Sequence, residues 1–419
     1  MSDNIFKIAQ KQIKDACDKL NCKPAVYEIL KQPMRLLEVS VPVKMDDGSI
    51  RIFSGYRSQH NDALGPAKGG FRFHPSITAD ETKALSMWMS FKGAIVGLPY
   101  GGGKGGVTCD PKELSLGEKE RLTRGYIQAI APFIGPEKDI PAPDVATNSQ
   151  IMAWVMDEFS KLKGYNSFGV VTGKPLILGG SQGRDKATAT GCCIVIREAA
   201  AKLGIDIKGA KIAIQGFGNA GANLSTILHD MGASIVAISD YKGGLYIPNG
   251  FNPYEVEKRD DAVKFLDDTV AAKYPGTKVI KADELVATEC DVLVPAAMEN
   301  QIHKDNAVGI RAKILAEAAN GPTTPEAHEI LIKKGVFIIP DILASAGGVT
   351  VSYFEWVQNL QNYYWSAEEV NERLERKMVT AFKNVHKTSQ DYSVDMRAAA
   401  YMVGIKLLAE AMEARGWLD

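Results

Sequence analysis

The chain has 419 residues, of which 45% are apolar and 24% are charged, and its formal net charge is −1. This length is sufficient for two or three domains with buried cores, and the composition is typical of a globular protein. The near-neutral charge argues against a nucleic acid or an anionic membrane as a partner, and no apolar run approaches the roughly 18 residues that a membrane helix needs.

The first part of the chain is expected to alternate between helices and strands. Residues 5–20 are predicted to form an amphipathic helix with mixed charges, without the apolar core of a signal peptide. Residues 50–57 are predicted to be extended. Thr78 and Glu81 have the spacing of a capping box, which opens a helix that we expect to end near Gly93. We expect the protein in the cytoplasm.

The densest glycine run, residues 101–106, encloses Lys104. Glycine permits backbone conformations and close approaches that other residues avoid, so such a run is seldom only a turn. It does not fit a phosphate-binding P-loop, because Leu98 and Gly105 stand at two positions that the pattern reserves for other residues. It also lacks the preceding strand of a dinucleotide fingerprint, because residues 97–100 make a poor strand. A solvated, flexible loop with an incidental lysine is the alternative.

A second glycine motif does have the right context. Residues 211–215 are predicted to form a buried strand, residues 222–231 a helix, and residues 234–239 a second strand. The glycines allow a tight turn, the pyrophosphate meets the helix N-terminus, and an acidic residue about 20 positions on binds the ribose hydroxyls. The pattern predicts a Rossmann-like cofactor site formed by Gly216, Phe217, Gly218, Asn219, Ala220 and Asp240.

The acidic residue also bears on the choice of nicotinamide cofactor. The carboxylate of Asp240 can accept hydrogen bonds from a free 2′-hydroxyl group and would repel a 2′-phosphate. Lys242 would partly offset that repulsion. We therefore expect NAD, with NADP as a lesser or shared cofactor.

Beyond a glycine-rich hinge at residues 179–183, helices alternate with short apolar strands, which suits a doubly wound parallel sheet. A second capping box at residues 366–369 opens a long charged helix, and a final helix is expected over residues 394–415. Six strands are expected, at residues 211–215, 234–239, 278–281, 291–294, 313–316 and 336–339.

Cysteine and histidine residues show no metal-binding pattern. The six histidines form no cluster with each other or with cysteine, so no metal site is expected. The cysteines lack disulfide or zinc spacing and are expected to be buried, reduced thiols. They are Cys17, Cys22, Cys109, Cys192, Cys193 and Cys290.

Three more side chains are candidates for chemistry, each with a simpler interpretation. Lys68 lies among glycines and a proline, where it could be a turn lysine. Lys92 ends an apolar helix face, where a lysine usually extends to water. Asp144 follows a stiff Pro-Ala-Pro segment and could instead cap the helix that runs on from Asn148.

Together with Lys104, these residues suggest one site. Three lysines suit a small substrate with two carboxylates. In close packing, like charges and burial lower the pKa of at least one lysine, and a neutral lysine beside an aspartate can act as base and proton shuttle. With a nicotinamide-binding domain in the same chain, the implied reaction is hydride transfer at a carbon that bears an amine or a hydroxyl group.

Six separated motifs in a fixed order carry a resemblance to a known family. They lie at residues 65–72, 98–106, 141–144, 216–219, 317–322 and 346–352. Along essentially its whole length, the chain resembles a glutamate dehydrogenase of the small hexameric type, within the Glu/Leu/Phe/Val dehydrogenase family.

The resemblance implies an α/β protein of two domains. Residues 1–184 would form an N-terminal α/β domain that binds substrate and builds the oligomer, a homohexamer. Residues 185–389 would form a Rossmann-like dinucleotide-binding domain. The C-terminal helix, within residues 390–419, would pack back, and the cleft between the domains would close for hydride transfer.

The resemblance also implies roles for the site residues. Lys68 and Ser352 hold the side-chain carboxylate of glutamate, and Lys92 holds the α-carboxylate. Lys104 is the catalytic lysine, and Asp144 passes protons to and from the amine. Further residues lie near the cofactor, and the last of them near the nicotinamide: Thr190, Asn219 and Asn320.

The implied reaction is the reversible oxidative deamination of L-glutamate to 2-oxoglutarate and ammonia. Hydride passes from the α-carbon of glutamate to NAD, which leaves an iminium. Lys104 in its neutral form activates a water that attacks the iminium carbon, and Asp144 relays protons until ammonia leaves. Met89 departs from the glutamine of some relatives, so recognition of the α-carboxylate depends more on Lys92. Pro143 stands where some relatives carry glycine.

Three rival functions make different demands on the sequence. A leucine, valine or phenylalanine dehydrogenase would leave the ammonium of Lys68 unpaired against an apolar substrate, so Lys68 with Ser352 favours glutamate. A non-catalytic nucleotide-binding or scaffolding protein predicts damage at the reacting groups, yet Lys104 and Asp144 are both present. The sequence contains no basic patch with interleaved aromatic residues that would indicate nucleic-acid binding.

Overall fold

The structure is a computed structural model that describes residues 4–241, 243–255 and 273–418. Lys242, which entered the interpretation of cofactor choice, lies outside the described residues. The chain forms two compact units, and the α/β class with two domains is confirmed. The first unit comprises Met1–Arg184, Val349–Arg373 and Tyr401–Asp419, and the second comprises Asp185–Gly348 and Leu374–Ala400.

The chain thus re-enters the first unit at Val349, inside the stretch that the sequence analysis assigned to the dinucleotide-binding domain. The reason is visible in α12 (Gly347–Gln361). Its Glu355 accepts from Lys174 at 2.7 Å, and its Trp356 donates from Nε1 to the carbonyl oxygen of Pro136 at 3.0 Å. These polar contacts tie the helix to the N-terminal part of the chain.

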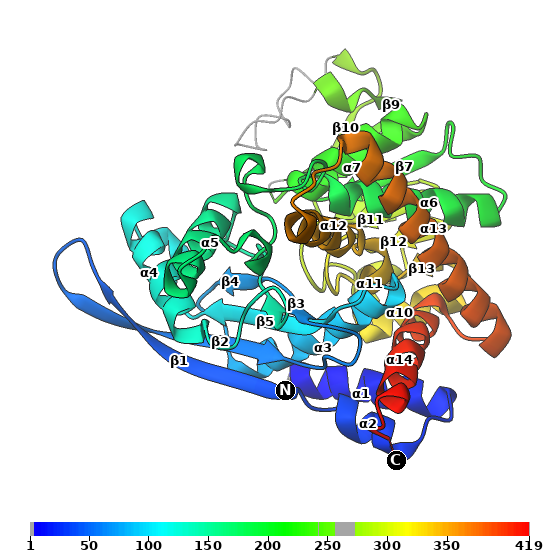
Figure 1. Cartoon of the computed structure of the whole chain (residues 1–419). Coiled ribbons are helices and arrows are strands. Elements are labelled where there is room, and N and C mark those ends of the chain that lie inside the picture. The colour runs from blue at the N-terminus through cyan, green and yellow to red at the C-terminus, as the bar shows by residue number, and fades with distance from the viewer. Residues whose placement is uncertain (1–3, 242, 256–272, 419) are drawn as a thin grey trace. The chain divides into compact units, whose positions relative to one another are not determined.

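The first unit contains a mixed sheet in the order β1-β2-β5-β3-β6, with β4 paired to β5. β1 and β2 form a long antiparallel hairpin, which lies beside β5 (Figure 1). The strands are β1 (Arg35–Lys44), β2 (Ile50–Gln59), β3 (Ala67–Lys68), β4 (Phe71–Phe73), β5 (Gly101–Val107) and β6 (Asp139–Ile140).

Helices cover this sheet, and α3 begins after Thr78 as predicted, because the hydroxyl of Thr78 accepts from the amide of Glu81. The predicted capping box is only half formed, since the carboxylate of Glu81 accepts from Arg72 instead. α3 packs against β5, whereas α4 packs against β1 and lies beside α5 (Figure 1). The helices are α1 (Ile5–Lys19), α2 (Pro24–Leu30), α3 (Ala79–Ile95), α4 (Leu116–Ile130) and α5 (Ser149–Lys163), with short 3-10 turns at Pro111–Glu113, Phe168–Val170 and Leu176–Leu178.

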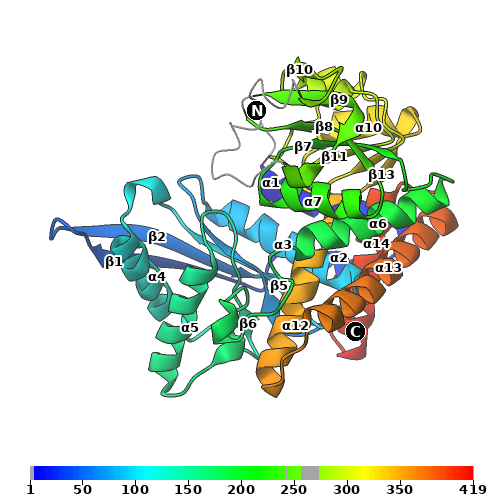
Figure 2. The ribbon, with the colours of Figure 1, turned by 90° about the horizontal axis from the view of Figure 1, so that it is seen from above.

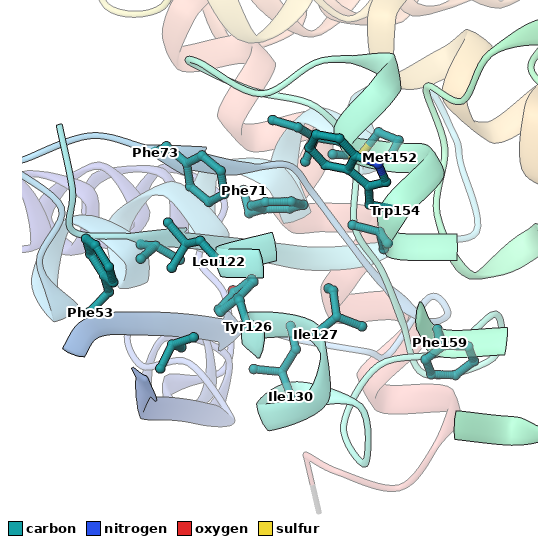
Figure 3. Close-up of a cluster of buried hydrophobic side chains, with 14 of the residues drawn as sticks. Phe53, Phe71, Phe73, Leu122, Tyr126, Ile127, Ile130, Met152, Trp154 and Phe159 are labelled. Carbon is teal, nitrogen blue, oxygen red and sulfur yellow. The ribbon is translucent and has the colours of Figure 1, made fainter. Parts of the chain in front are cut away.

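A cluster of buried side chains fills the space between the sheet and the pair α4 and α5. Phe53 and Phe71 come from the strands, Tyr126 from α4, and Met152 and Phe159 from α5 (Figure 3). Each is fully or almost fully buried. Because burying one such side chain is worth about 1.5–3 kcal/mol, this cluster is a main source of stability for the unit.

The glycine run of the sequence forms β5, and all of its seven residues are buried. A Cβ on Gly101 would lie 1.9 Å from the carbonyl oxygen of Asn61, and one on Gly102 would lie 2.1 Å from that of Ser86. The interpretation as a solvated loop is therefore wrong. This strand was not predicted because glycine is depleted in strands.

The second unit contains a sheet in the order β10-β9-β8-β7-β11-β12-β13. β8, β7, β11, β12 and β13 run parallel, as predicted, whereas β9, at one side of the sheet, pairs antiparallel with both β8 and β10. β9 was not predicted. The strands are β7 (Lys211–Gln215), β8 (Ser234–Ser239), β9 (Gly244–Phe251), β10 (Lys278–Ile280), β11 (Val292–Pro295), β12 (Ile314–Ala316) and β13 (Phe337–Ile339).

α6 and α7 pack together beside this sheet (Figure 2). The described helices here are α6 (Ala187–Lys202), α7 (Asn219–Asp230), α9 (Lys304–Ala307), α10 (Pro325–Lys333) and α11 (Asp341–Ala344), with 3-10 turns at Pro253–Glu255 and Glu284–Ala287. The chain ends with α13 (Ala367–Tyr392) and α14 (Met396–Ala414), each of which has residues in both units.

All six cysteines are free thiols; five are buried and Cys22 is half-buried. Within the described residues, no helix combines the length and the apolarity needed to cross a membrane. The same residues contain no group of three or more side chains suited to hold a metal ion.

Candidate functional site

Three short segments, far apart in the sequence, run parallel in the first unit. β3 pairs with β5 on one side and with β6 on the other, and Phe71 forms a bridge to Pro143. The amide of Phe71 donates to the carbonyl oxygen of Ala142 at 3.0 Å. This arrangement brings the segments that carry Lys68, Lys104 and Asp144 side by side.

Lys104 and Asp144 form an ion pair, with Nζ 2.7 Å from Oδ2 and side-chain exposures of only 9% and 18%. Strand pairing places Lys104 on the face of the sheet that carries α3, because its pairing partner Ser58 contacts Ser86 of that helix at 2.8 Å. Arg72 donates from Nε to the same Oδ2 atom of Asp144 at 2.8 Å.

The pair is electrostatically unequal. Burial lowers the pKa of Lys104, and the charge of Asp144 only partly offsets this effect. Burial would raise the pKa of Asp144, but the charges and hydrogen bonds of Lys104 and Arg72 hold it well below its usual range. Asp144 is therefore ionised at neutral pH, and Lys104 releases its proton more easily than an exposed lysine does.

Lys68 is almost completely buried and contacts neutral oxygens. Its Nζ donates to Oγ1 of Thr172 at 2.7 Å and to the carbonyl oxygens of Ile140 and Pro141 at 3.2 Å each. Burial and the positive charge of Arg184 hold the pKa of Lys68 well below its ordinary value. A carboxylate beside this ammonium would favour its charged form.

Ser352 and Arg184 lie in the same unit as Lys68. Nε of Arg184 donates to Oγ of Ser352 at 3.0 Å, and Ser352 is buried on α12. Arg184 was not predicted from the sequence, because no local pattern around it indicates its contact with the distant Ser352.

Lys92 is half-buried in the last turn of α3. Met89 precedes it by three residues, on the same side of the helix, and its Cγ atom would lie 3.3 Å from a Cβ on Gly69. This side of α3 therefore faces the segment that follows Lys68.

Behind β5 lies a buried ion pair that the sequence analysis did not predict. Arg57 donates from Nε to Oδ2 of Asp139 at 2.7 Å, and both side chains are fully buried. Nη1 of Arg57 also donates to the carbonyl oxygen of Gly69 at 3.1 Å. A Cβ on Gly103 would lie 2.9 Å from Oδ1 of Asp139, so the missing side chain makes room for the pair.

In the second unit, the three glycines of the fingerprint have three different environments. Gly216 has a φ of +97°, and a Cβ on Gly221 would lie 1.9 Å from the carbonyl oxygen of Gly216. By contrast, nothing lies within 4 Å of a Cβ built on Gly218. Gly218 also precedes the 12-residue helix α7 without a capping side chain, so the helix N-terminus is open to an anion.

The remaining predicted cofactor residues lie in this unit too. Phe217 and Ala220 are half-buried beside Gly218, and Asp240 follows β8, where its Oδ1 accepts from the amide of Gly243 at 3.2 Å. Asn219 donates from Nδ2 to the carbonyl oxygen of Asp185 at 3.4 Å. On α6, Oγ1 of Thr190 donates to the carbonyl oxygen of Lys186 at 3.1 Å.

Asn320 is exposed in the loop after β12. Buried Glu317, at the end of that strand, accepts from the amide of Asp341 at 2.9 Å and pairs with Arg397. Asp341 in turn accepts from the amide of Gly321 at 2.9 Å. The loop that presents Asn320 is thus anchored on both sides.

These features fit a dinucleotide. β7 is the point at which the strand order reverses, since β8 lies on one side of it and β11 on the other, and dinucleotides bind at such points. At the carboxyl ends of β7 and β8, Oε1 of Gln215 and Oγ of Ser239 are buried without a hydrogen-bond partner among the described residues. Buried polar atoms normally have partners, so these two suit a bound polar ligand.

Comparisons with known proteins agree with this arrangement. The family Glutamate/Leucine/Phenylalanine/Valine dehydrogenase matches residues 179–416, and the Glu/Leu/Phe/Val dehydrogenase dimerisation domain matches residues 33–161. The chain belongs to this family. The resemblance found in the sequence motifs is confirmed.

The dehydrogenase is 56% identical to the cryptic catabolic NAD-specific glutamate dehydrogenase GudB of Bacillus subtilis (strain 168), over 99% of this chain and 96% of that protein. It is 54% identical to the NAD-specific glutamate dehydrogenase of Staphylococcus aureus (strain COL), over 99% of each.

Solved structures give the same result. The glutamate dehydrogenase from Peptoniphilus asaccharolyticus has a TM-score of 0.88 and 46% identity, and the match covers 99% of this chain and 100% of that one. The hetero-hexameric glutamate dehydrogenase from Thermus thermophilus has a TM-score of 0.91 and 38% identity, with 99% and 98% of the two chains covered.

Proposed function

We propose that the dehydrogenase catalyses the reversible oxidative deamination of L-glutamate to 2-oxoglutarate and ammonia with NAD. The two bacterial relatives named as NAD-specific glutamate dehydrogenases support this reaction. The structural observation that supports the choice of glutamate is the buried amino group of Lys68, with Arg184 and Ser352 close by. An apolar substrate side chain would offer Lys68 no counter-charge, and an unpaired charge is costly in a buried site.

In this proposal the first unit binds the substrate. Lys68, Ser352 and Arg184 hold the side-chain carboxylate, and Thr172 orients Lys68 through its 2.7 Å hydrogen bond. Lys92 holds the α-carboxylate. Binding of the side-chain carboxylate of the substrate would restore the charged form of Lys68, since an opposite charge raises the pKa of a lysine.

Lys104 and Asp144 carry the proton transfers. Neutral Lys104 takes a proton from the water that attacks the α-carbon, and its lowered pKa supports this role. Asp144, 2.7 Å from Lys104, relays protons to the departing amine. Exclusion of bulk water would strengthen the electrostatic interaction between Lys104 and Asp144.

The second unit binds the cofactor. NAD, when bound, supplies the hydride acceptor. The turn Gly216–Ala220 and the N-terminus of α7 would hold the pyrophosphate, and Asp240 would bind the ribose hydroxyls. Thr190, Asn219 and Asn320 would lie near the cofactor, with Asn320 nearest to the nicotinamide ring. NAD is favoured over NADP because Asp240 repels a 2′-phosphate.

We also propose that the enzyme is a homohexamer built through its first domain and that it works in the cytoplasm. The match of residues 33–161 to a dimerisation domain and the likeness to a hetero-hexameric enzyme support assembly. Light scattering coupled to size-exclusion chromatography tests it: a mass of six chains is expected, and a monomer would contradict the proposal.

The function is tested by following the absorbance of reduced nicotinamide with glutamate, leucine, valine and phenylalanine, each with NAD and with NADP. We expect glutamate with NAD to give the highest kcat/KM. A higher kcat/KM for leucine, valine or phenylalanine would favour the alternative, a branched-chain or aromatic amino-acid dehydrogenase, and would refute the proposed substrate.

A further inference from the structure

Arg72 lies between two carboxylates of the first unit. Its Nε donates to Oδ2 of Asp144 at 2.8 Å, and its Nη1 donates to Oε1 of Glu81 at 2.9 Å. Arg72, Asp144 and Glu81 have side-chain exposures of only 16–18%. With Lys104 on the same oxygen of Asp144, two cations and two anions form one closely packed group.

The position of Glu81 shows that the contact with Arg72 is specific. In a capping box, the glutamate bonds back to the amide at the start of its helix, as Glu118 does to Ser115 at 2.8 Å in α4. Glu81 occupies the same position in α3, and its amide donates to Thr78. Its carboxylate, however, accepts from Arg72.

The group is electrostatically balanced. Asp144 accepts from Lys104 and Arg72 on a single oxygen, and both cations lower its pKa against the effect of burial. Arg72 also lowers the pKa of Lys104. Glu81 opposes Arg72, so its charge weakens the effect of Arg72 on both reacting groups. Behind β5, Arg57, which is paired with Asp139, also lowers the pKa of Lys104.

We propose that Arg72 is a positioning residue for the deamination reaction: it fixes Asp144 against Lys104, and Glu81 sets the strength of its influence on the proton exchange between them. This inference rests on the proposed function and deepens it. Arg72 holds Oδ2 of Asp144 at a fixed point, so the carboxylate keeps its orientation when Lys104 gives up its proton. Glu81 prevents the full charge of Arg72 from acting on the site.

The pH dependence of kcat/KM for glutamate tests the proposal, because removing Arg72 and removing the charge of Glu81 have opposite effects. In Arg72→Met, the pKa values of Asp144 and Lys104 both rise, so the acidic limb moves to higher pH by about 1 unit or more. In Glu81→Gln, Arg72 acts unopposed, both pKa values fall, and the same limb moves to lower pH. A purely structural role would not produce shifts of opposite sign.

Two further variants complete the experiment. Arg72→Lys keeps a cation and is expected to return the limb towards its wild-type position, with a lower kcat because one ammonium cannot hold Asp144 and Glu81 in the same geometry. Arg124→Met is the matched control, because Arg124 of α4 also pairs with several carboxylates, namely Glu120 of its own helix and Asp157 and Glu158 of α5. Its limb is expected to stay at the wild-type pH.

The outcomes test the role of Arg72 and Glu81 separately from the proposed substrate. Unchanged limbs in Arg72→Met and Glu81→Gln, or shifts in the same direction, would overturn the inference. If Arg72→Met does not fold, as judged by circular dichroism, the direction of the shift in Glu81→Gln decides alone. If the wild-type enzyme prefers another amino acid but the limbs still move in opposite directions, the proposed substrate fails and the inference stands.

Discussion

The two units of this dehydrogenase use glycine for different physical reasons. In β5, glycines allow backbones to touch, since a Cβ on Gly102 would lie 2.1 Å from the carbonyl oxygen of Ser86. In the fingerprint of the second unit, Gly218 has open space around its missing side chain, with nothing within 4 Å. The first kind of glycine builds a site from the protein's own segments, and the second leaves room for a ligand. Substitutions should separate the two kinds.

The largest effect is expected at the lysine inside β5. Lys104→Ala should lower kcat by about a thousandfold or more, because a group that takes part in proton transfer contributes about 10²–10⁴-fold. NAD affinity, which depends on the second unit, should be largely retained. Steady-state kinetics and calorimetric titration with NAD measure the two properties. Unchanged turnover would refute the role of Lys104.

The ion pair behind β5 is expected to give the largest loss of stability. Arg57→Met leaves the carboxylate of Asp139 buried without its partner, at a cost of about 3–5 kcal/mol in the free energy of unfolding. The double variant Arg57→Met with Asp139→Leu should be less destabilised than the single variant. Denaturant unfolding measures both. Equal losses in the single and double variants would argue against an unpaired charge as the cause.

The next prediction concerns Gly102, whose backbone is in close contact with α3. Gly102→Ala forces a methyl group against Ser86 and Ser90, and we expect a loss of about 3 kcal/mol in the free energy of unfolding together with reduced activity. Thermal and denaturant unfolding of the variant provide the measurement. Wild-type stability would show that the strand tolerates a side chain and would remove the packing argument.

Acid should destabilise the fold beside the same strand. His60 is buried, its amide donates to the carbonyl oxygen of Gly102 at 2.7 Å, and burial lowers its pKa to about 4 from an ordinary 6.5. Below pH 6.5 the unfolded chain binds a proton that the folded protein rejects, so up to about 3 kcal/mol is lost as the pH falls towards 4. His60→Gln should reduce this slope in unfolding measurements between pH 7 and 4; an unchanged slope would contradict the assignment.

The smallest effect on stability is expected in the second unit. Gly218→Ala places a methyl group in open space, so the free energy of unfolding should change by less than about 1 kcal/mol. The Kd for NAD should nevertheless rise about tenfold, because the methyl group occupies the approach to the N-terminus of α7. Titration with NAD tests this. If Gly218→Ala instead lost much stability and kept its affinity for NAD, Gly218 would have a packing role like that of Gly102, and the contrast between the two glycines would be wrong.

The sequence predicts the second unit better than the first, because the signals of the second unit are local. Its parallel strands are apolar runs between turns, and the fingerprint from Gly216 lies within a few residues of its strand and helix. In the first unit the sequence suggested that Lys104 and Asp144 lie together, but it did not show which strands bring them together. β5 was not recognisable as a strand, and Arg57 meets its partner Asp139 from a distance of 82 residues in the sequence.

The capping box of α3 shows where local reasoning stops. Thr78 and Glu81 predict the start of the helix correctly. Nothing in the local pattern indicates that the carboxylate of Glu81 binds Arg72, or that Arg72 binds Asp144, since these contacts depend on tertiary structure. Arg184 was missed for the same reason, because its partner Ser352 follows 168 residues later.

The crowded strand also restricts how this enzyme could evolve. Gly101, Gly102 and Gly103 abut different neighbours, respectively Asn61, Ser86 and Asp139. A lineage that gained a side chain at any of these positions would have to shift a neighbouring segment in the same mutational step. We therefore expect a deep mutational scan to find almost no viable alternative at the three positions, while nearby surface sites drift freely.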